Sequence, residues 1–148
     1  MEKTIHQIVL ADDDADDCMF FQDALEELPV SVSLTIVNDG VELMRYLSRN
    51  SDNLPDLLFL DLNMPRKTGF ECLTEIKEDE KLRQLPVIIY STSLDIEVLN
   101  VVYERGAFGY IRKPGDYTQL KKVIHEAILL STRRSATQPA REAFVLQP

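Results

Sequence analysis

The sequence predicts an α/β fold in which helices cover both faces of a parallel β-sheet. Two observations lead to this class. Five short apolar runs alternate along the 148 residues with five longer segments whose apolar residues recur at helical spacing. Three of the runs are continuously apolar, which is typical of strands buried on both faces of a parallel sheet. Alternation with right-handed crossovers therefore gives a doubly wound sheet of five strands with five flanking helices.

The first part of the chain supplies two strands and two helices. A first strand is expected at residues 5–11, and the acidic run at 12–17 starts a helix that ends before Pro29. Residues 32–37 alternate apolar with polar side chains, so the second strand should have one less buried face, as at the edge of a sheet. A second helix follows at residues 41–47.

The rest of the chain repeats this alternation three times. The expected strands are residues 57–60, 86–91 and 110–112, and the expected helices are 68–76, 96–105 and 116–128. The strands at 57–60 and 86–91 are continuously apolar, whereas the strand at 110–112 is mixed. The mixed second and fifth strands belong at the edges, which fits the flavodoxin-like strand order 2-1-3-4-5.

One domain is expected at residues 1–131, followed by a polar tail at 132–148 that lacks helical or strand periodicity. The tail is interpreted as flexible, because polar chain ends without periodicity are usually frayed. Phe144, Val145 and Leu146 near its end leave open the alternative that this segment docks on the domain or on a partner.

Composition and charge narrow the class of protein. Apolar residues make up 45% of the chain and charged residues 28%, which is ordinary for a globular protein. No apolar run approaches the length of a membrane span, and residues 1–4 lack the core of a secretion signal, so a cytoplasmic protein without a membrane partner is expected. The net charge of −9 disfavours direct DNA binding and suits a bound cation. Cys18 and Cys72 fall within expected helices, which favours buried thiols over a disulfide or metal site.

Asp61 follows directly after the apolar strand at residues 57–60. In open α/β sheets ligands bind beyond the carboxyl ends of the strands, so an acid at this position is a candidate site residue. For an isolated residue, an aspartate that only caps a loop is the simpler interpretation. The residues at the other strand ends decide between the two.

Two further acids, Asp12 and Asp13, end the first strand, which neighbours the third strand in the expected order. Three carboxylates this close repel one another, and either raised pKa values or a divalent cation would compensate. Hard oxygen ligands in a partly open site favour Mg²⁺ for phosphate chemistry. An EF-hand does not fit this run, because Asp17 stands where that loop requires glycine. Asp14, Asp16 and Asp17 instead suit a helix cap and first-turn acids.

Ser91 and Lys113 follow the fourth and fifth strands and should reach the same edge of the sheet. A hydroxyl and an ammonium group beside the acids and a cation would donate hydrogen bonds to phosphoryl oxygens. Pro114 holds Lys113 in an extended conformation. Together with the three acids, these residues favour a phosphoryl site over a capping role for Asp61.

Four motifs give the chain a resemblance to a known family. They are residues 8–13 (IVLADD), 58–65 (LFLDLNMP) with Gly69 downstream, 86–91 (PVIIYS) and 106–114 (GAFGYIRKP). In this order and spacing they resemble the receiver domain of bacterial two-component response regulators, over about residues 5–130. Any one of these motifs alone would be weak, but the four together are specific.

The resemblance implies a signalling switch that catalyses its own phosphorylation and dephosphorylation, and not an enzyme for an external substrate. Asp61 would be the phosphoacceptor, taking a phosphoryl group from a sensor histidine kinase or a phosphotransfer protein. Asp13 would bind Mg²⁺ directly and Asp12 mainly through water. Asp61 and the backbone carbonyl of Asn63 would complete the protein ligands.

The resemblance also assigns the residues that respond to phosphorylation. Lys113 would pair with the phosphoryl group, Ser91 would turn inward to hydrogen-bond it, and Tyr110 would follow as a switch from exposed to buried. The surface of the fourth helix, fifth strand and fifth helix would then change its protein partners, with a homodimer as one option. Thr92 stands where the family usually has a smaller residue, so access to the phosphoryl site depends on it.

The chain resembles a stand-alone receiver of the chemotaxis-regulator type, because the tail offers no DNA-binding helix-turn-helix and no output domain. The loops at residues 48–53 and 78–84 slightly resemble those of receivers that partner bacterial phytochromes. Two other functions stay open. A Mg²⁺-dependent phosphohydrolase with Asp61 as nucleophile is disfavoured, because Asn63 cannot act as a general base. An interaction module that keeps the fold without phosphorylation is disfavoured by the full set of site residues.

Overall fold

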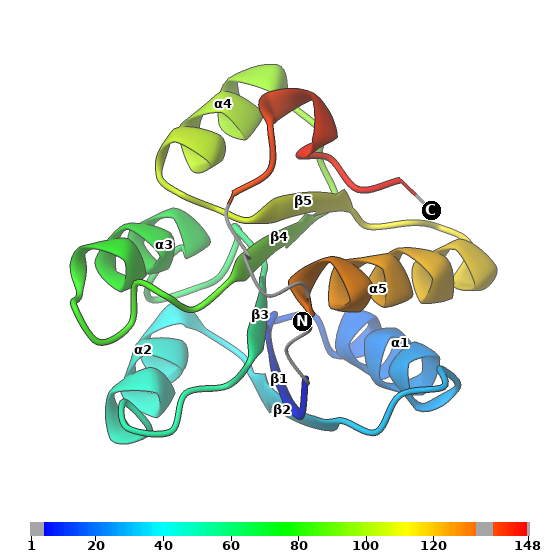
Figure 1. Ribbon diagram of the computed structural model, residues 1–148, viewed down its shortest axis with the longest axis horizontal. Coiled ribbons are helices and arrows are strands. Elements are labelled where there is room, and N and C mark those ends of the chain that lie inside the picture. Colours follow the sequence, from blue (N-terminus) through cyan, green and yellow to red (C-terminus); the bar gives the residue numbers. More distant parts are fainter. Residues whose placement is uncertain (1–4, 133–137, 148) are drawn as a thin grey trace.

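The computed structural model describes residues 5–132 and 138–147. Five parallel strands form one sheet in the order β2-β1-β3-β4-β5, as the sequence predicted. The strands are β1 (Gln7–Ala11), β2 (Ser33–Val37), β3 (Leu57–Leu60), β4 (Val87–Ser91) and β5 (Gly109–Arg112). The helices are α1 (Ala15–Glu26), α2 (Gly40–Arg49), α3 (Gly69–Glu78), α4 (Ile96–Glu104) and α5 (Tyr117–Ser131) (Figure 1).

Helices cover both faces of the sheet. Helices α1 and α5 pack on one face, and α2, α3 and α4 cover the other (Figure 1). Strands β3 and β4 are buried along their whole length, whereas β2 at the edge is partly exposed, as the apolar patterns predicted. Because both faces are covered, the carboxyl edge of the sheet is where loops meet solvent and where a ligand can bind.

Side-chain caps fix where the helices begin. The Asp14 carboxylate accepts hydrogen bonds from the backbone N–H groups of Asp16 at 2.9 Å and Asp17 at 3.0 Å, so α1 begins a few residues after β1. The interpretation of Asp14 as a cap is thereby confirmed. Thr68 and Glu71 form a capping box at the start of α3. These caps keep the connections after β1 and β3 anchored at the carboxyl edge.

Gly69, the first residue of α3, lies against the loop that follows β3. A Cβ atom at this position would be 2.3 Å from the backbone carbonyl oxygen of Asp61 and 2.7 Å from the Cα of Leu62. The Gly69 N–H also donates to the Leu62 carbonyl at 3.0 Å. Only glycine allows so close an approach, so Gly69 sets the backbone of Asp61 directly against the end of a helix.

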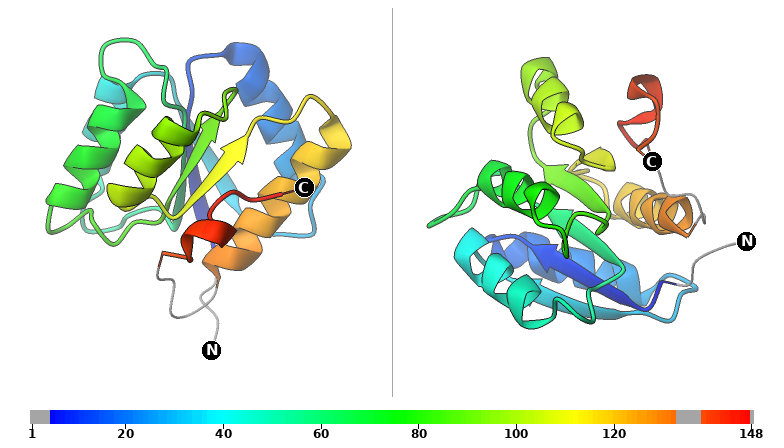
Figure 2. Two further views of the ribbon diagram at one scale, coloured as in Figure 1. Left: turned by 90° about the horizontal axis from the view of Figure 1, so that it is seen from above. Right: turned by 60° about the vertical axis from the view of Figure 1, so that its left-hand side comes forward.

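The end of the chain differs from the flexible tail expected at residues 132–148. Residues 138–147, here called the C-terminal strap, fold back over β5 and include a short 3₁₀ helix at Arg141–Ala143 (Figure 2). The expectation for residues 133–137 lies outside the described residues. For residues 138–147 the docking alternative is the one that the structure shows.

The strap pairs with β5 through an isolated β-bridge and packs its Phe144 ring against Tyr103 of α4. Val145 forms a parallel bridge with Tyr110, whose N–H donates to the Phe144 carbonyl at 3.0 Å. The Leu146 N–H donates to the Tyr110 carbonyl at 2.9 Å. The ring of Phe144 is fully buried, with its centroid 5.0 Å from that of Tyr103. The strap therefore buries β5, which the sequence placed at an open edge.

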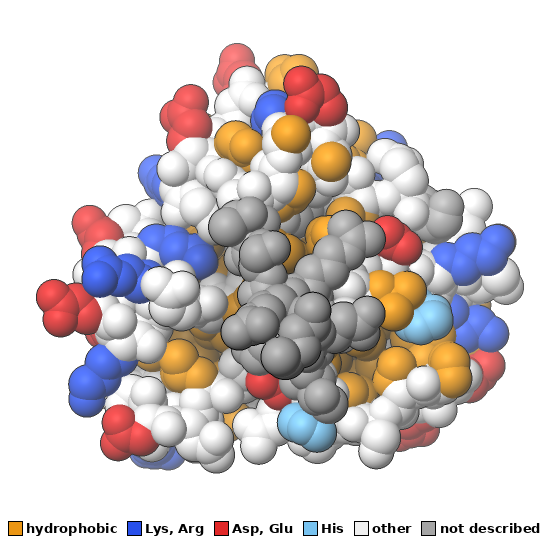
Figure 3. All heavy atoms as spheres, in the orientation of Figure 1, with side chains coloured by type: hydrophobic (Ala, Val, Ile, Leu, Met, Phe, Trp, Pro, Cys, Tyr) orange, Lys and Arg blue, Asp and Glu red, His pale blue; other side chains and the backbone are white. Residues whose placement is uncertain are grey.

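The surface carries charges of both signs. On the face drawn in Figure 3, Lys and Arg side chains are interspersed with Asp and Glu. Within residues 5–132 and 138–147, no helix is both long and apolar enough to cross a membrane. Cys18 and Cys72 are buried free thiols, which confirms their interpretation.

Candidate functional site

The parallel register brings acidic residues together at the carboxyl edge of the sheet. Ala11 at the end of β1 pairs with Leu60 at the end of β3, and the Asp61 N–H donates to the Ala11 carbonyl at 2.9 Å. Asp12 and Asp61 therefore leave two neighbouring strands at the same level. The topology alone places these two acids side by side.

Three carboxylates meet at this edge. Asp12, Asp13 and Asp61 each offer an oxygen, and these oxygens lie within 4.8 Å of one another. Asp12 and Asp61 are buried, whereas Asp13 is exposed, so the cluster is open on one side. An open set of hard oxygen donors fits Mg²⁺ and the chemically similar Mn²⁺, and it lacks the sulfur or imidazole ligands that softer metals prefer.

Asp61 is held in a partly desolvated position. The Asn63 N–H donates to Asp61 Oδ1 at 3.2 Å, which orients the carboxylate. Burial raises the pKa of Asp61 from its usual value to about 6, against the opposing charge of Lys113 and the Asn63 hydrogen bond, while the Asp12 charge adds to the rise. A cation at the three acids would favour the ionised, nucleophilic form of Asp61.

Lys113 follows β5 and reaches into the acidic cluster. Its Nζ donates to Asp12 Oδ2 and to Asp17 Oδ2, each at 2.8 Å, and lies 3.4 Å from Asp61 Oδ2. The ammonium lies 5.1 Å from the centroid of the Tyr90 ring. Burial lowers the pKa of Lys113, but hydrogen bonds to Asp12 and Asp17 and the charge of Asp61 outweigh it and raise the pKa above its usual value. The ammonium therefore stays charged.

Asp17 is a site residue that the sequence analysis missed. It was expected only as a first-turn acid of α1, yet its carboxylate forms an ion pair with Lys113. The available signal was its position: a residue in the first turn of a helix that starts just after β1 remains near the carboxyl edge. The capping role of Asp14 explains why this first turn is fixed there.

Ser91 and Tyr110 converge on Ser93. The Lys113 N–H donates to the Ser91 carbonyl at 2.7 Å, which joins the ends of β4 and β5 as expected. The Ser91 hydroxyl lies 3.4 Å from the Ser93 hydroxyl and accepts from the Ser93 N–H at 3.4 Å. Tyr110 is buried, and its hydroxyl donates to the Ser93 carbonyl at 2.7 Å. Thr92, between the two serines, is exposed.

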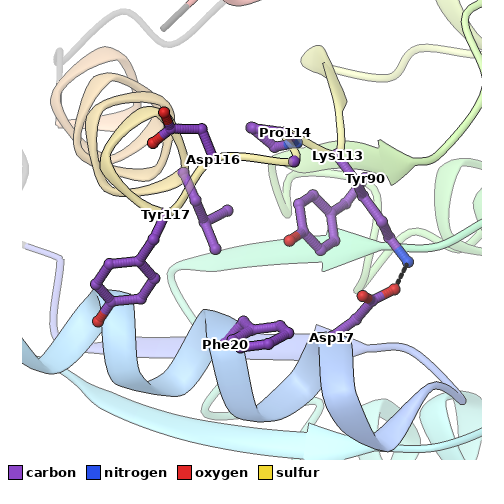
Figure 4. Close-up of a pocket in the computed structure, with 9 residues that line it drawn as sticks. Asp17, Phe20, Tyr90, Lys113, Pro114, Asp116 and Tyr117 are labelled. Carbon is purple, nitrogen blue, oxygen red and sulfur yellow. Dashed lines mark hydrogen bonds and ion pairs between the residues drawn. The ribbon is translucent and has the colours of Figure 1, made fainter.

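A pocket of about 270 Å³ opens beside Lys113, between α1 and the start of α5 (Figure 4). Asp17 and Lys113 form its charged end, and Phe20 and Tyr90 contribute its aromatic walls. Its remaining lining residues are Pro114, Gly115, Asp116, Tyr117 and Leu120. The pocket therefore joins an apolar surface to the ion pair of Asp17 and Lys113.

Comparison with known proteins gives a consistent family. The model of the response regulator receiver domain matches residues 8–125. Response regulator Rcp1 of Synechocystis is 31% identical over 121 residues, which cover 79% of this chain and 82% of Rcp1.

Solved structures agree in fold. The phosphorylated cyanobacterial phytochrome response regulator RcpA matches with a TM-score of 0.77 and 35% identity, over 93% of this chain and 100% of RcpA. The Mn²⁺-bound form of Rcp1 from Synechocystis matches with a TM-score of 0.76 and 29% identity, over 91% of this chain and 99% of that one.

Proposed function

This chain belongs to the response regulator receiver family of two-component systems, whose members are phosphorylated on aspartate, and we propose that Asp61 is its phosphoacceptor. The observation that carries the proposal is the position of the Asp61 carboxylate. It lies within 4.8 Å of the oxygens of Asp12 and Asp13 and 3.4 Å from the Lys113 ammonium. A nucleophile between a cation site and an ammonium group suits attack on a phosphoryl group.

In the proposed reaction an Asp61 oxygen attacks the phosphorus of a phosphohistidine. The new P–O bond forms as the P–N bond breaks, and the imidazole leaves on the donor protein. A divalent cation held by Asp12, Asp13, Asp61 and the Asn63 carbonyl would neutralise charge on the phosphoryl oxygens. Mg²⁺ is proposed for this role, supported by the all-oxygen ligand set and by the Mn²⁺-bound Rcp1 structure.

The remaining roles follow from hydrogen-bond donors at the carboxyl edge. Lys113 donates to a phosphoryl oxygen, for which its short distance to Asp61 is suited. Ser91 is proposed to turn away from Ser93 and toward the phosphoryl group. Ser93, whose carbonyl accepts a hydrogen bond from the Tyr110 hydroxyl, would then lose its contact with the Ser91 hydroxyl. Tyr110 is thereby proposed as a switch residue that links Asp61 to the strap and α4.

The proposed donor is a sensor histidine kinase or a phosphotransfer protein, acting in the cytoplasm. Similarity to RcpA supports a phytochrome-type kinase as the class of donor. The output is proposed to be a change in protein contacts, including a homodimer, without direct DNA binding.

The test is to incubate the full chain with Mg²⁺ and acetyl phosphate and to follow the intact mass. The proposal expects a labile adduct with the mass of one phosphoryl group, which is absent without Mg²⁺ and absent in Asp61→Asn. No adduct with acetyl phosphate or with phosphorylated kinases would refute it. Steady multi-turnover release of phosphate from phosphomonoesters would instead support a hydrolase.

A further inference from the structure

Asp17 approaches Lys113 as closely as any acid of the site does. Its Oδ2 lies 2.8 Å from Lys113 Nζ, equal to the Asp12 distance and shorter than the 3.4 Å to Asp61. Figure 4 shows the Asp17 side chain projecting from α1 toward Lys113, at the charged end of the pocket. The Lys113 side chain is 8% exposed and that of Asp17 is 29% exposed, so this contact is partly shielded from solvent.

The ammonium group has three N–H donors, and three carboxylates lie around it. The contacts with Asp12 and Asp17 are short, and the contact with Asp61 is longer. The aromatic ring of Tyr90 lies below the ammonium at 5.1 Å, and the edge-on Phe21 ring packs against Tyr90 at 5.5 Å. The Lys113 ammonium is therefore held by two short ion pairs and by the face of the Tyr90 ring.

Asp12 and Asp17 differ in their relation to the candidate cation site. Asp12 belongs to the cluster of three acids that fits a cation, and Asp17 does not. When a cation takes up part of the Asp12 charge, its attraction for the ammonium weakens. Asp17 is then the acid that keeps Lys113 in place.

We propose that Asp17 is a positioning residue for phosphoryl transfer, whose carboxylate holds the Lys113 ammonium beside Asp61 where it meets the incoming phosphoryl oxygen. The inference rests on the proposed function of Asp61. It adds a residue from α1 that does not touch the phosphoryl group and acts through Lys113. Without this hold, the ammonium no longer keeps its place beside Asp61, and the incoming phosphoryl oxygen loses a positioned hydrogen-bond donor.

Electrostatics alone would give the opposite sign. Asp17 is a negative charge near the path of an anionic phosphodonor, so its removal would speed phosphorylation if repulsion dominated. Positioning instead requires that removal slows the reaction. The direction of the change therefore separates the two accounts.

Asp16 provides a matched control. It lies in the same first turn of α1 and carries the same charge, so it contributes equally to the helix dipole. Its side chain is exposed, and the three acceptors that surround the Lys113 ammonium are those of Asp12, Asp17 and Asp61. A difference between the Asp16 and Asp17 variants reports the contact with Lys113.

The test measures the rate of adduct formation over a range of acetyl phosphate concentrations at saturating Mg²⁺, with Mg²⁺ affinity from calorimetry. Asp17→Ala is expected to lower the limiting rate about tenfold, with the half-saturating donor concentration and the Mg²⁺ affinity unchanged. Asp16→Ala should stay within about twofold of the wild type. Asp17→Glu keeps the carboxylate and should restore most of the rate.

A double-mutant cycle shows whether Asp17 acts through Lys113. In the Lys113→Ala background, Asp17→Ala is expected to cause no further loss of rate. An equal loss in both backgrounds, a faster Asp17→Ala variant, or equal losses for Asp16→Ala and Asp17→Ala would each overturn the proposal. If urea unfolding shows that Asp17→Ala is unfolded, Asp17→Asn is used in its place, because it keeps the size of the side chain. Failure of the proposed function would give a different result from these outcomes. In that case the wild type and Asp61→Asn would not differ in adduct formation.

Discussion

The carboxyl edge of the sheet and its β5 edge affect the stability of the fold in opposite ways. At the carboxyl edge, the carboxylates of Asp12, Asp13 and Asp61 lie close together beside Lys113, which contacts Asp12 and Asp61, and burial raises the pKa of Asp61. At the β5 edge, the C-terminal strap adds backbone hydrogen bonds and the buried Phe144 ring. The first region gathers like charges that oppose folding, and the second buries apolar surface that favours it.

This difference shows that the residues placed for reaction with a phosphoryl group and the residues that stabilise the fold lie in separate regions of the molecule. Carboxylates that repel one another are kept where a cation and a phosphoryl group can bind. The strap pairs with the backbone of Tyr110, and the Tyr110 hydroxyl donates to the Ser93 carbonyl next to the carboxyl edge, so the two regions meet at Tyr110. Variants of the carboxyl edge should therefore change reactivity, and variants of the strap should change stability.

The largest effect is expected for Asp61→Asn. Loss of the nucleophile should abolish the phosphoryl adduct, because an amide does not replace an ionised carboxylate as attacking group. The free energy of unfolding should not decrease, since one of three like charges is removed. Intact mass and urea unfolding measure the two quantities, and a clear loss of stability would contradict the separation of the two regions.

Phe144→Ala should show the reverse pattern. Removal of the buried ring is expected to lower the free energy of unfolding by about 3 kcal/mol, through lost burial and the cavity left between Tyr103 and Tyr110. Adduct formation with acetyl phosphate should continue. Phe20→Ala serves as the control, because Phe20 is 52% exposed and its removal should cost less than about 1 kcal/mol. Equal losses for the two variants would show that the strap does not stabilise the domain.

The raised pKa of Asp61 predicts how stability depends on pH. The folded pKa is about 6 and the unfolded pKa is close to 3.9, so the native state binds more protons between these values. Stability is then greatest below the unfolded pKa and falls as the pH rises through the folded pKa. Compared with Asp61→Asn, the wild type should lose on the order of 1–2 kcal/mol between about pH 4 and pH 6 in the presence of a chelator.

Urea unfolding of both proteins across this pH range measures the effect. Mg²⁺ should stabilise the wild type more at neutral than at acidic pH, because the cation binds the ionised acids. A difference between the two proteins that is constant with pH would show that Asp61 titrates normally.

The smallest effect is expected for Thr92→Ala. Thr92 is exposed next to Ser91, and we propose that its side chain limits the approach of water to a phosphoryl group on Asp61. The adduct lifetime should change by a few-fold, on the order of 1 kcal/mol in the barrier, with unfolding unaffected. The decay of the adduct mass over time measures it, and an unchanged lifetime would argue against control of access by this side chain.

Much of the site could be predicted because it follows from topology. Parallel strands place Asp12 and Asp61 at the ends of β1 and β3, and Lys113 and Ser91 at the ends of β5 and β4. The ion pair of Asp17 could not be predicted in this way. It depends on where the first turn of α1 points its side chains, and a first-turn acid is already explained by the helix dipole.

The strap could not be predicted for a related reason. Phe144 and Leu146 pack on opposite faces of the sheet, but two apolar residues are too short a pattern to indicate a strand. The same contact explains why Tyr110 is buried, because its cover comes from residues that are distant in sequence. Local sequence patterns predicted the helices and strands, but they could not predict the long-range contacts that the end of the chain makes.

The most direct test of the central claim locates the phosphoryl group. The full chain is treated with Mg²⁺ and acetyl phosphate and then with borohydride, which reduces an acyl phosphate on aspartate to homoserine, and peptides are analysed by mass spectrometry. The account expects homoserine at position 61, with aspartate retained at Asp12, Asp13 and Asp17. Homoserine at one of those positions, or at none, would contradict it.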